Sequence, residues 1–342
     1  MKVDFSAASK AQAMFGKRLR FQDYQELAKK ANVAEIASYL KNQTDYDSFL
    51  EGVNEHSIHR GYLELLIRQN YFYRFSKLLR YTNDSKEFIR FRIMNVEYQL
   101  ILSTIYMLND ENRSDMIARL PLRLDQYISF PMEKLVEVRS IDELLEVIRD
   151  TIYYKALVPY HGESNQDLNV SACEYSLRDV YTHANIELIN NQFKGETAKE
   201  LYEVFATQVE LNNITRIYRL KKYYQMSPLD IKLNINMIHC KIDEKVMNDW
   251  IDVCNAEEMI EQFSQSSYYK FIKGKEFLYI ENYLSWIEYQ MNLWYMRYSQ
   301  NPEVIIVCYL SLLQFEITNL VNIIEGVRYH VAAEKVMQLL VY

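Results

Sequence analysis

The feature that most constrains this 342-residue chain is a pattern that occurs three times, at offsets of 108 and 115 residues. In each copy a good helix N-cap stands three residues before a glutamate, which is the signature of a capping box. Apolar residues follow one and five positions after each glutamate, and a tyrosine follows eleven positions after it. The three sets of cap, glutamate and tyrosine are Asn32, Glu35 and Tyr46; Ser140, Glu143 and Tyr154; and Asn255, Glu258 and Tyr269. A period near a third of the chain length predicts an internal triplication.

A second landmark recurs in the same order and supports the same period. Glu97, Glu210 and Glu316 each begin a run of acidic, apolar, polar, variable and apolar residues. Apolar residues around each run are spaced by three and four positions, which places them on one face of a helix. These seams are Phe91, Met94, Tyr98, Ile101 and Ile105; Val204, Thr207, Leu211, Ile214 and Tyr218; and Leu310, Leu313, Ile317, Leu320 and Ile324. The sequence therefore predicts three amphipathic helices whose seam residues are buried.

Two asparagines lie at matched positions beside these seams. Asn213 and Asn319 each follow the landmark glutamate by three residues, where the first copy has Leu100. A buried amide needs hydrogen-bond partners. We expect each to bond a neighbouring helix and to fix its register.

Composition favours an all-α fold. With only 7 Gly and 5 Pro, the chain lacks the turn residues that extended β architectures require. No stretch is rich in Ser or Gly, so the breaks between helices are short. We expect three similar helical subdomains, with boundaries at 1–124, 125–235 and 236–342.

Charge, cysteine spacing and hydropathy exclude several classes of protein. A net charge of −7 argues against a nucleic-acid partner, because phosphate binding needs excess Lys and Arg. Cys173, Cys240, Cys254 and Cys308 are scattered, which is typical of reduced thiols rather than of disulfides or a zinc site. The N-terminus has no signal-peptide core. The apolar run Val304–Leu313 is about half a membrane span, so it predicts a buried helix.

The sequence offers no catalytic constellation. Lys273–Gly274–Lys275 lacks the upstream glycine and the Lys-Ser/Thr ending of a phosphate loop. His56 and His59 have metal-ligand spacing, but no third ligand is evident. No Ser or Cys stands in a nucleophile context. We expect no catalytic residue, no bound cofactor and no metal ion.

A cluster of cations is the best candidate for contact with another molecule. Arg216, Arg219, Lys221 and Lys222 place four positive charges within seven residues. Solvated helix ends also carry such cations, because they are favoured near the C-terminus of a helix. The alternative is a contact with an acidic partner, and these four residues are the predicted partner surface.

Together these segments resemble the C subunit of the bacterial and archaeal V/A-type rotary ATPases, the counterpart of the d subunit of the vacuolar proton pump. The resemblance covers the N-terminal amphipathic segment from Ala11 to Leu27, the first two box-helix-tyrosine units and the C-terminal run from Tyr309 to Gly326. The most specific part is the Glu-x-x-Asn-Leu sequence at Glu316 with the Glu-Gly pair that ends at Gly326. The sequence departs from the family at Leu100 and in the segment Gln12–Lys17, where we would expect arginines.

The resemblance implies a funnel of three helical subdomains about a pseudo-threefold axis. It implies a non-catalytic central-stalk subunit, peripheral on the cytoplasmic face of the membrane, without a membrane span of its own. Its partners would be the central-shaft subunits of the ATPase head and the membrane proteolipid ring. Linking them would couple ATP hydrolysis or synthesis to H⁺ or Na⁺ transport.

The main alternative is a helical-repeat adaptor with no link to ion transport. Common adaptor repeats are about 34 to 47 residues long, far shorter than this period. A third class, an all-helical enzyme, would need acidic or histidine pairs facing a common cavity, and no such pairs are evident.

Overall fold

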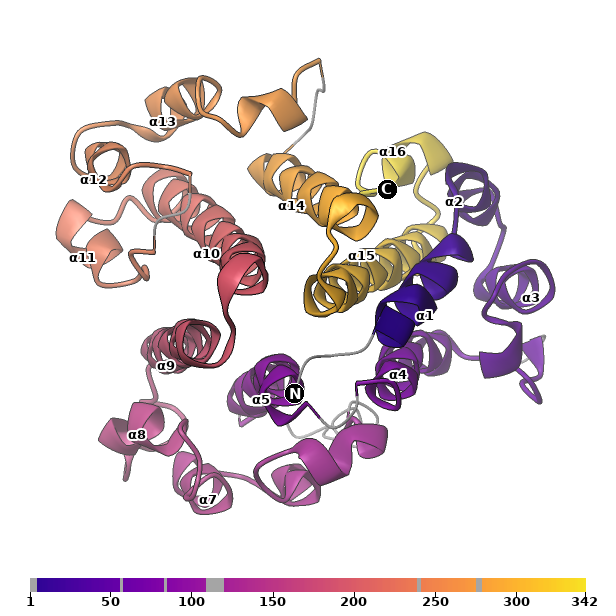
Figure 1. Ribbon diagram of the computed structural model, residues 1–342, viewed down its shortest axis with the longest axis horizontal. Helices are drawn as coiled ribbons and strands as arrows, with labels where there is room; N and C mark the ends of the chain where they lie inside the picture. Colours follow the sequence, from indigo (N-terminus) through magenta and orange to yellow (C-terminus); the bar gives the residue numbers. More distant parts are fainter. Residues whose placement is uncertain (1–4, 56–57, 83–84, 109–119, 239–240, 275–278) are drawn as a thin grey trace. The chain divides into compact units, whose positions relative to one another are not determined.

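The computed structural model describes residues 5–55, 58–82, 85–108, 120–238, 241–274 and 279–342. Every regular element in these ranges is a helix (Figure 1), which confirms the all-α fold. The chain forms two compact units. Unit 1 is Asp84–Phe263, and unit 2 combines Lys2–Asn83 with Ser264–Tyr342.

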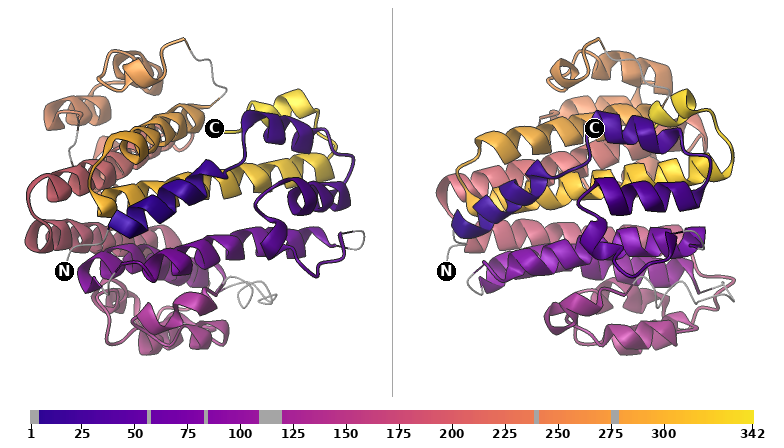
Figure 2. Two further views of the ribbon diagram at one scale, coloured as in Figure 1. Left: turned by 45° about the vertical axis from the view of Figure 1, so that its right-hand side comes forward. Right: turned by 90° about the vertical axis from the view of Figure 1, so that its right-hand side faces the viewer.

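Unit 2 is built around the helix α15. Its N-terminal elements are α1 (Phe5–Gly16), α2 (Phe21–Ala28), α3 (Val33–Gln43), η1 (Asp47–Phe49) and α4 (Arg60–Leu79). Its C-terminal elements are η6 (Tyr269–Phe271), α14 (Ile280–Tyr298), α15 (Pro302–Arg328) and α16 (Ala333–Met337). Helix α15 packs against α1, α2, α3, α4, α14 and α16, so segments from both ends of the chain share one core (Figure 2).

Helix α15 is long and apolar enough to cross a membrane by length and composition alone. However, 72% of its most apolar window is buried in the folded protein. The run Val304–Leu313 is therefore part of a core helix, as the sequence predicted.

Unit 1 is a layer of three long helices with shorter elements packed on it. It contains α5 (Lys86–Tyr106), η3 (Leu122–Tyr127), η4 (Met132–Val136), α7 (Ile141–Val147), α8 (Tyr154–Leu157), η5 (Val158–Tyr160), α9 (Val170–Gln192), α10 (Gly195–Lys222), α11 (Pro228–Lys232), α12 (Glu244–Asp252) and α13 (Ala256–Phe263). Helix α9 packs against both α5 and α10, while α13 packs on α10.

The predicted seams face the cores of α5, α10 and α15. Ile101, Ile214 and Leu320 are fully buried. Among the other seam residues Tyr218 is half-buried and the rest are buried. The spacing of three and four residues therefore identified the buried faces.

The three capping residues stand at helix starts, as predicted. Asn32 and Ser140 accept hydrogen bonds from the N3 amides of α3 and α7, at 3.0 and 3.2 Å. Asn255 accepts from the amide of Glu258 at 2.9 Å, and the carboxylate of Glu258 accepts from the amide of Asn255 at 2.9 Å, which completes a capping box.

The tyrosine eleven positions after the capping glutamate is buried only in the first copy. The buried tyrosines are Tyr46, Tyr153 and Tyr268, whereas Tyr154 is half-buried and Tyr269 is exposed. Each buried tyrosine has a Ser or Thr two residues before it, whose hydroxyl accepts from the tyrosine amide. The same local hydrogen bond therefore precedes the buried tyrosine in all three copies.

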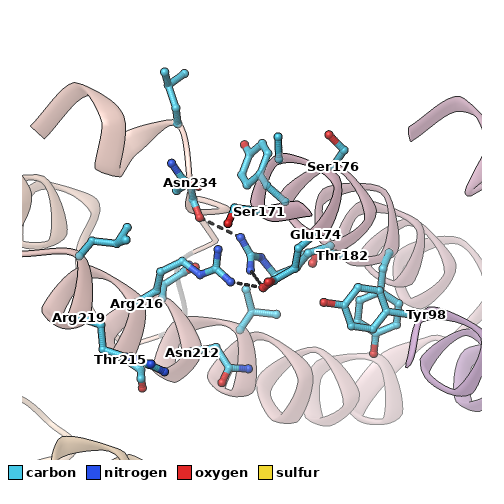
Figure 3. A pocket seen from close by; sticks show the side chains of 18 of the residues that line it. Tyr98, Ser171, Glu174, Ser176, Thr182, Asn212, Thr215, Arg216, Arg219 and Asn234 are labelled. Carbon is cyan, nitrogen blue, oxygen red and sulfur yellow. Dashed lines mark hydrogen bonds and ion pairs between the residues drawn. The ribbon is translucent and has the colours of Figure 1, made fainter. Parts of the chain in front are cut away.

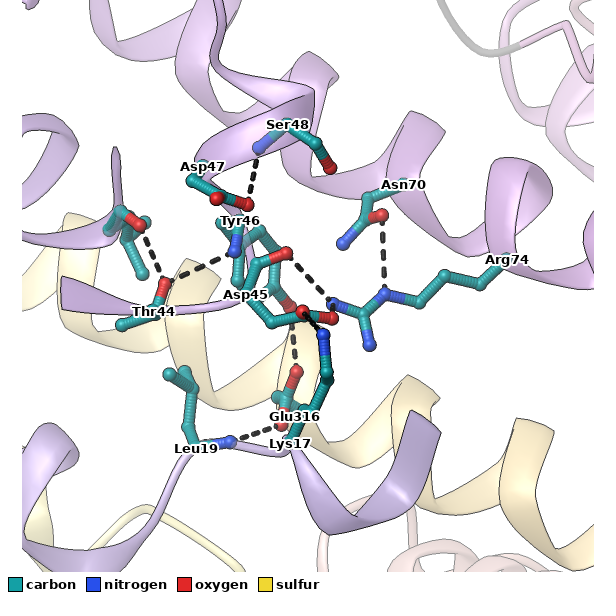
Figure 4. Close-up of polar contacts among 11 residues, drawn as sticks. Lys17, Leu19, Thr44, Asp45, Tyr46, Asp47, Ser48, Asn70, Arg74 and Glu316 are labelled. Atoms are coloured by element: carbon teal, nitrogen blue, oxygen red, sulfur yellow. Dashed lines mark hydrogen bonds and ion pairs between the residues drawn. The ribbon is translucent and has the colours of Figure 1, made fainter. Parts of the chain in front are cut away.

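In unit 2 a buried tyrosine meets the landmark glutamate of α15 (Figure 4). Glu316 accepts from the Tyr46 hydroxyl at 2.8 Å and from the Leu19 amide at 2.8 Å. Burial raises the pKa of Glu316, while Arg74 and these donors oppose that rise. Arg74 in turn pairs with Asp45 at 3.2 Å. One carboxylate thus joins α15 to two segments of the N-terminal part of the chain.

The same arrangement recurs in unit 1. Glu97 of α5 accepts from the Tyr153 hydroxyl at 3.1 Å, from the Ser129 amide at 2.7 Å and from Arg90 at 2.8 Å. Glu210 of α10 accepts from the Ile242 amide at 3.0 Å. The landmark glutamates are therefore acceptors for backbone amides that lie far along the chain.

The two landmark asparagines are buried. The side chain of Asn319 bonds Tyr24 of the neighbouring helix α2, as expected, and both asparagines also bond backbone groups. Asn319 donates to the Val341 carbonyl at 2.6 Å and accepts from its amide at 3.0 Å. Asn213 donates to the Asn236 carbonyl at 2.5 Å. Val341 and Asn236 lie in non-helical segments, which cannot satisfy their own backbone groups and therefore need side-chain partners.

The Glu-Gly pair of α15 also has a structural role. Glu325 forms an ion pair with Arg60 at 2.5 Å. A Cβ atom at Gly326 would lie 2.5 Å from Cγ2 of Val336, so α16 packs directly against the backbone of α15 there. The subdomain boundaries at 1–124, 125–235 and 236–342 and the threefold funnel stay predictions.

Replacing Gly326 tests this close approach. Gly326→Ala should destabilise the protein by about 1–2 kcal/mol, because overpacking against the stiff Val336 exceeds the gain in helix propensity. Gly16→Ala is the matched control, since a Cβ there would meet nothing within 4 Å. Chemical denaturation measures both. Equal midpoints for the two variants would contradict close packing at Gly326.

Removing a single hydroxyl tests the junction at Glu316. Tyr46→Phe should lower the free energy of unfolding by about 1.5–3 kcal/mol, because the lost hydrogen bond is buried and its acceptor is a carboxylate. Tyr39→Phe is the control, because its hydroxyl donates to Asp23 at 2.9 Å from a half-exposed position. The control should cost less than about 1 kcal/mol. Urea unfolding monitored by circular dichroism compares the two variants. Equal losses of unfolding free energy would show that the buried hydrogen bond of Tyr46 contributes no more than the half-exposed one of Tyr39.

Candidate functional site

A hollow of about 960 Å³ opens in unit 1 (Figure 3). Its walls come from α5, α9 and α10, and from the segment between Tyr224 and Asn234. Among the described residues that line it, the charged ones are Glu174, Arg178, Arg216 and Arg219. The other lining residues include many hydroxyl and amide side chains.

Glu174 joins the three long helices at the hollow. Its carboxylate accepts from the Tyr106 hydroxyl of α5 at 2.7 Å and from Arg178 of α9 at 3.0 Å. It also pairs with Arg216 of α10. Both oxygens of the carboxylate are engaged, so the two guanidinium groups are held in fixed positions.

Arg178 is held by groups beyond Glu174. It donates to the Asn234 carbonyl at 2.9 Å and to Asn236 at 3.1 Å. Burial, together with the neighbouring Arg216, lowers the pKa of Arg178. Burial is the larger of these two causes, and the nearby Glu174 carboxylate opposes both.

Tyrosines and one threonine complete the wall. Tyr98 stacks on Tyr181 at a centroid distance of 5.0 Å, and burial raises the pKa of Tyr98 to about 12. The Oγ1 atom of Thr182 is buried and has no hydrogen-bond partner, and the residue is only 1% exposed. Most buried polar side chains have partners, so this hydroxyl is an unused hydrogen-bonding group at the hollow.

The structure divides the predicted cation cluster into two pairs. Arg216 and Arg219 line the hollow. Lys221 donates to the carbonyls of Ile251 and Cys254, at 2.7 Å each, and so holds the C-terminal end of α12. Lys222 pairs with Glu257 of α13. Burial lowers the pKa of Lys221.

Sequence reasoning missed Glu174 and Arg178. Their spacing of four residues on one helix is a recognisable ion-pair signal. Nothing local connects them to Tyr106 or Arg216, which lie on other helices and reach Glu174 only in the folded unit.

The described residues contain no group of three His, Cys, Asp or Glu that could hold a metal ion. His59 caps α4 by accepting from the Gly61 amide at 3.2 Å, whereas His56 and Cys240 lie outside the described residues. Cys173, Cys254 and Cys308 are buried and do not form disulfides. Burial raises the pKa of Cys173 to about 12, which makes its thiol a poor nucleophile.

Comparison with known proteins finds C subunits of ATP synthases, both by family model and by individual relatives. A family model described as ATP synthase (C/AC39) subunit matches residues 7–339. The C subunit of the A-type ATP synthase of Methanosphaera stadtmanae is 23% identical over 246 residues, covering 69% of this chain and 60% of that protein. The protein of the same name from Methanosarcina mazei is 21% identical over 274 residues, covering 78% of this chain and 71% of that protein.

The contacts of the Glu174 carboxylate with Tyr106, Arg178 and Arg216 should make the stability of the protein depend on pH. Burial opposes ionisation of Glu174, but Tyr106, Arg216 and Arg178 outweigh it and hold its pKa below the ordinary value of 4.5. The folded state therefore favours the carboxylate. Its contribution is complete above about pH 4.5 and is lost as pH falls through the lower pKa of the folded state.

Glu174→Gln should therefore lower the free energy of unfolding most at neutral pH, and the difference from wild type should shrink in acid. Urea unfolding from about pH 7 to about pH 3.5 measures it. Glu187→Gln, at an exposed position of the same helix, is the control. If Glu174→Gln lowered the free energy of unfolding by the same amount at every pH in this range, the Glu174 carboxylate would not be the ionised group that stabilises the fold.

Proposed function

The chain belongs to the ATP synthase (C/AC39) subunit family, and from that membership we propose that it is a non-catalytic central-stalk subunit of a V/A-type ATPase. In this role it links the rotating central shaft of the ATPase head to the proteolipid ring in the membrane. The link couples ATP hydrolysis or synthesis to H⁺ or Na⁺ transport. The protein lies on the cytoplasmic face of the membrane, where its partners hold it.

The observation that carries this proposal is the family match over residues 7–339, nearly the whole chain. Several residues of the C-terminal run that resembles the family have defined contacts in unit 2. Glu316 binds Tyr46 and Leu19, Asn319 binds Val341, and Gly326 packs against Val336. These contacts support the assignment because the resemblance rests on side chains that stabilise the fold.

The internal bonding of unit 2 also suits a mechanical link. A protein that passes torque must resist shear between its own segments. Glu316 fixes α15 to the segments around Leu19 and Tyr46. Arg60 of α4 forms an ion pair with Glu325, near the C-terminal end of α15. Force applied to α15 would thus be shared with the N-terminal helices.

The proposal is tested by deleting the chain from the ATPase complex. In membrane vesicles from the deletion strain, the head should still hydrolyse ATP, while ATP-driven ion uptake should fall to background. Chemistry and rotation of the ring are then no longer joined. Re-expression of the wild-type chain should restore uptake, and Gly16→Ala is a suitable variant control because a Cβ there meets no neighbouring atom. Ion uptake at the normal rate without the chain would rule out the coupling role.

A further inference from the structure

The charged side chains that line the hollow of unit 1 are engaged within the protein. The three side-chain nitrogens of Arg178 all donate hydrogen bonds, one of them to Glu174. Arg216 pairs with the same carboxylate, and Arg219 also has an interaction within the protein. A charged ligand would have to displace contacts of this kind, so the hollow does not favour one.

Neutral polar groups of the hollow, in contrast, lack partners in the part of the chain that the structure describes. The Oγ1 atom of Thr182 has no hydrogen bond, although this residue is only 1% exposed. Other lining side chains have a hydroxyl or amide group without a hydrogen bond among the described residues: Tyr98, Gln99, Ser171 and Asn212. Hydroxyl and amide groups each combine donors with acceptors. They match a ligand whose own groups both donate and accept, as alcohols do.

Tyrosine rings give the hollow an aromatic wall. Tyr106 lines it and is 55% exposed, and its hydroxyl donates to Glu174 at 2.7 Å, which holds the ring in place. Tyr98 is held by stacking on Tyr181, with ring centroids 5.0 Å apart. An aromatic ring packs against apolar C–H groups, while neighbouring hydroxyl and amide groups bond the polar edge of the same ligand. Saccharides present both kinds of surface.

We propose that the hollow of unit 1 binds a neutral saccharide. Figure 3 shows Tyr98, Thr182 and Asn212, which come from α5, α9 and α10, the three helices that form its walls. These side chains exchange hydrogen bonds with the sugar hydroxyls, and the C–H face of the sugar packs on Tyr106. Glu174 is a positioning residue, because it orients the Tyr106 ring before binding. A volume of about 960 Å³ is within the range of small-molecule sites.

Ligand-observed saturation-transfer NMR on the full-length protein tests this proposal, with glucose, maltose and trehalose as probes. At least one probe should bind saturably, with a Kd between about 0.1 and about 10 mM. Thermal stabilisation is not a suitable measurement, because sugars stabilise folded proteins by exclusion from their surface. Inorganic pyrophosphate is the charged control and should not displace the bound sugar at equal concentration.

Thr182→Val separates a ligand contact from a structural role. The variant keeps nearly the same shape, and the hydroxyl that it removes has no partner in the unbound protein. Its urea midpoint should therefore equal or exceed that of wild type, while its affinity for the sugar should fall about tenfold. Asn212→Ala should lower the affinity by about the same factor. Asn190→Ala, at an exposed position of α9 outside the hollow lining, is the control and should bind as wild type does.

Three outcomes would overturn the inference. In the first, none of the three sugars binds saturably. In the second, a sugar binds but folded Thr182→Val and Asn212→Ala bind it as wild type does, which would place the contact elsewhere. In the third, pyrophosphate displaces the sugar, which would show that the hollow prefers an anion. The coupling role does not depend on these results, because ion uptake in membrane vesicles measures it separately.

Discussion

In both units, the packing of distant segments on a central helix depends on a buried carboxylate that accepts hydrogen bonds from their backbone amides. Glu316 binds Leu19 and Tyr46 in unit 2, and Glu97 binds Ser129 and Tyr153 in unit 1. Burying a charge is costly unless several donors satisfy it. The donors here come from segments that lie far along the chain from the helix. The carboxylate therefore specifies which turn of the helix each segment meets, in addition to any stability that it contributes.

Local patterns in the sequence predicted local structure well. The caps at Asn32 and Ser140 and the buried seam residues Ile101 and Leu320 depend on hydrogen bonds and spacing within one helix. The sequence does not show which of two adjacent tyrosines, Tyr153 or Tyr154, is buried. The hydroxyl of Tyr153 donates to Glu97, which lies 56 residues away in the chain, and this tertiary contact has no local signature.

The candidate site shows the same limit. The Glu174 and Arg178 pair has a helical spacing that a sequence can reveal. The convergence of Tyr106 and Arg216 on that carboxylate joins three helices and has no local signature. The cation cluster was visible as a run of charges, but Lys221 binds the carbonyls at the end of α12 instead of facing the hollow. Charge in a sequence indicates where cations are abundant, and packing decides what each of them contacts.

Two kinds of carboxylate have different structural roles in this chain. Glu316 is buried with a raised pKa and has donors that belong to the fold itself, so it holds segments together. Glu174 is partly exposed, has a lowered pKa and shares its charge between two arginines. A carboxylate of the second kind joins helices instead of distant loop segments, because its donors are the Tyr106 hydroxyl of α5, Arg178 of α9 and Arg216 of α10. The same chemical group therefore serves two ends: a buried carboxylate fixes where a non-helical segment meets a helix, and a partly exposed one holds neighbouring helices in register.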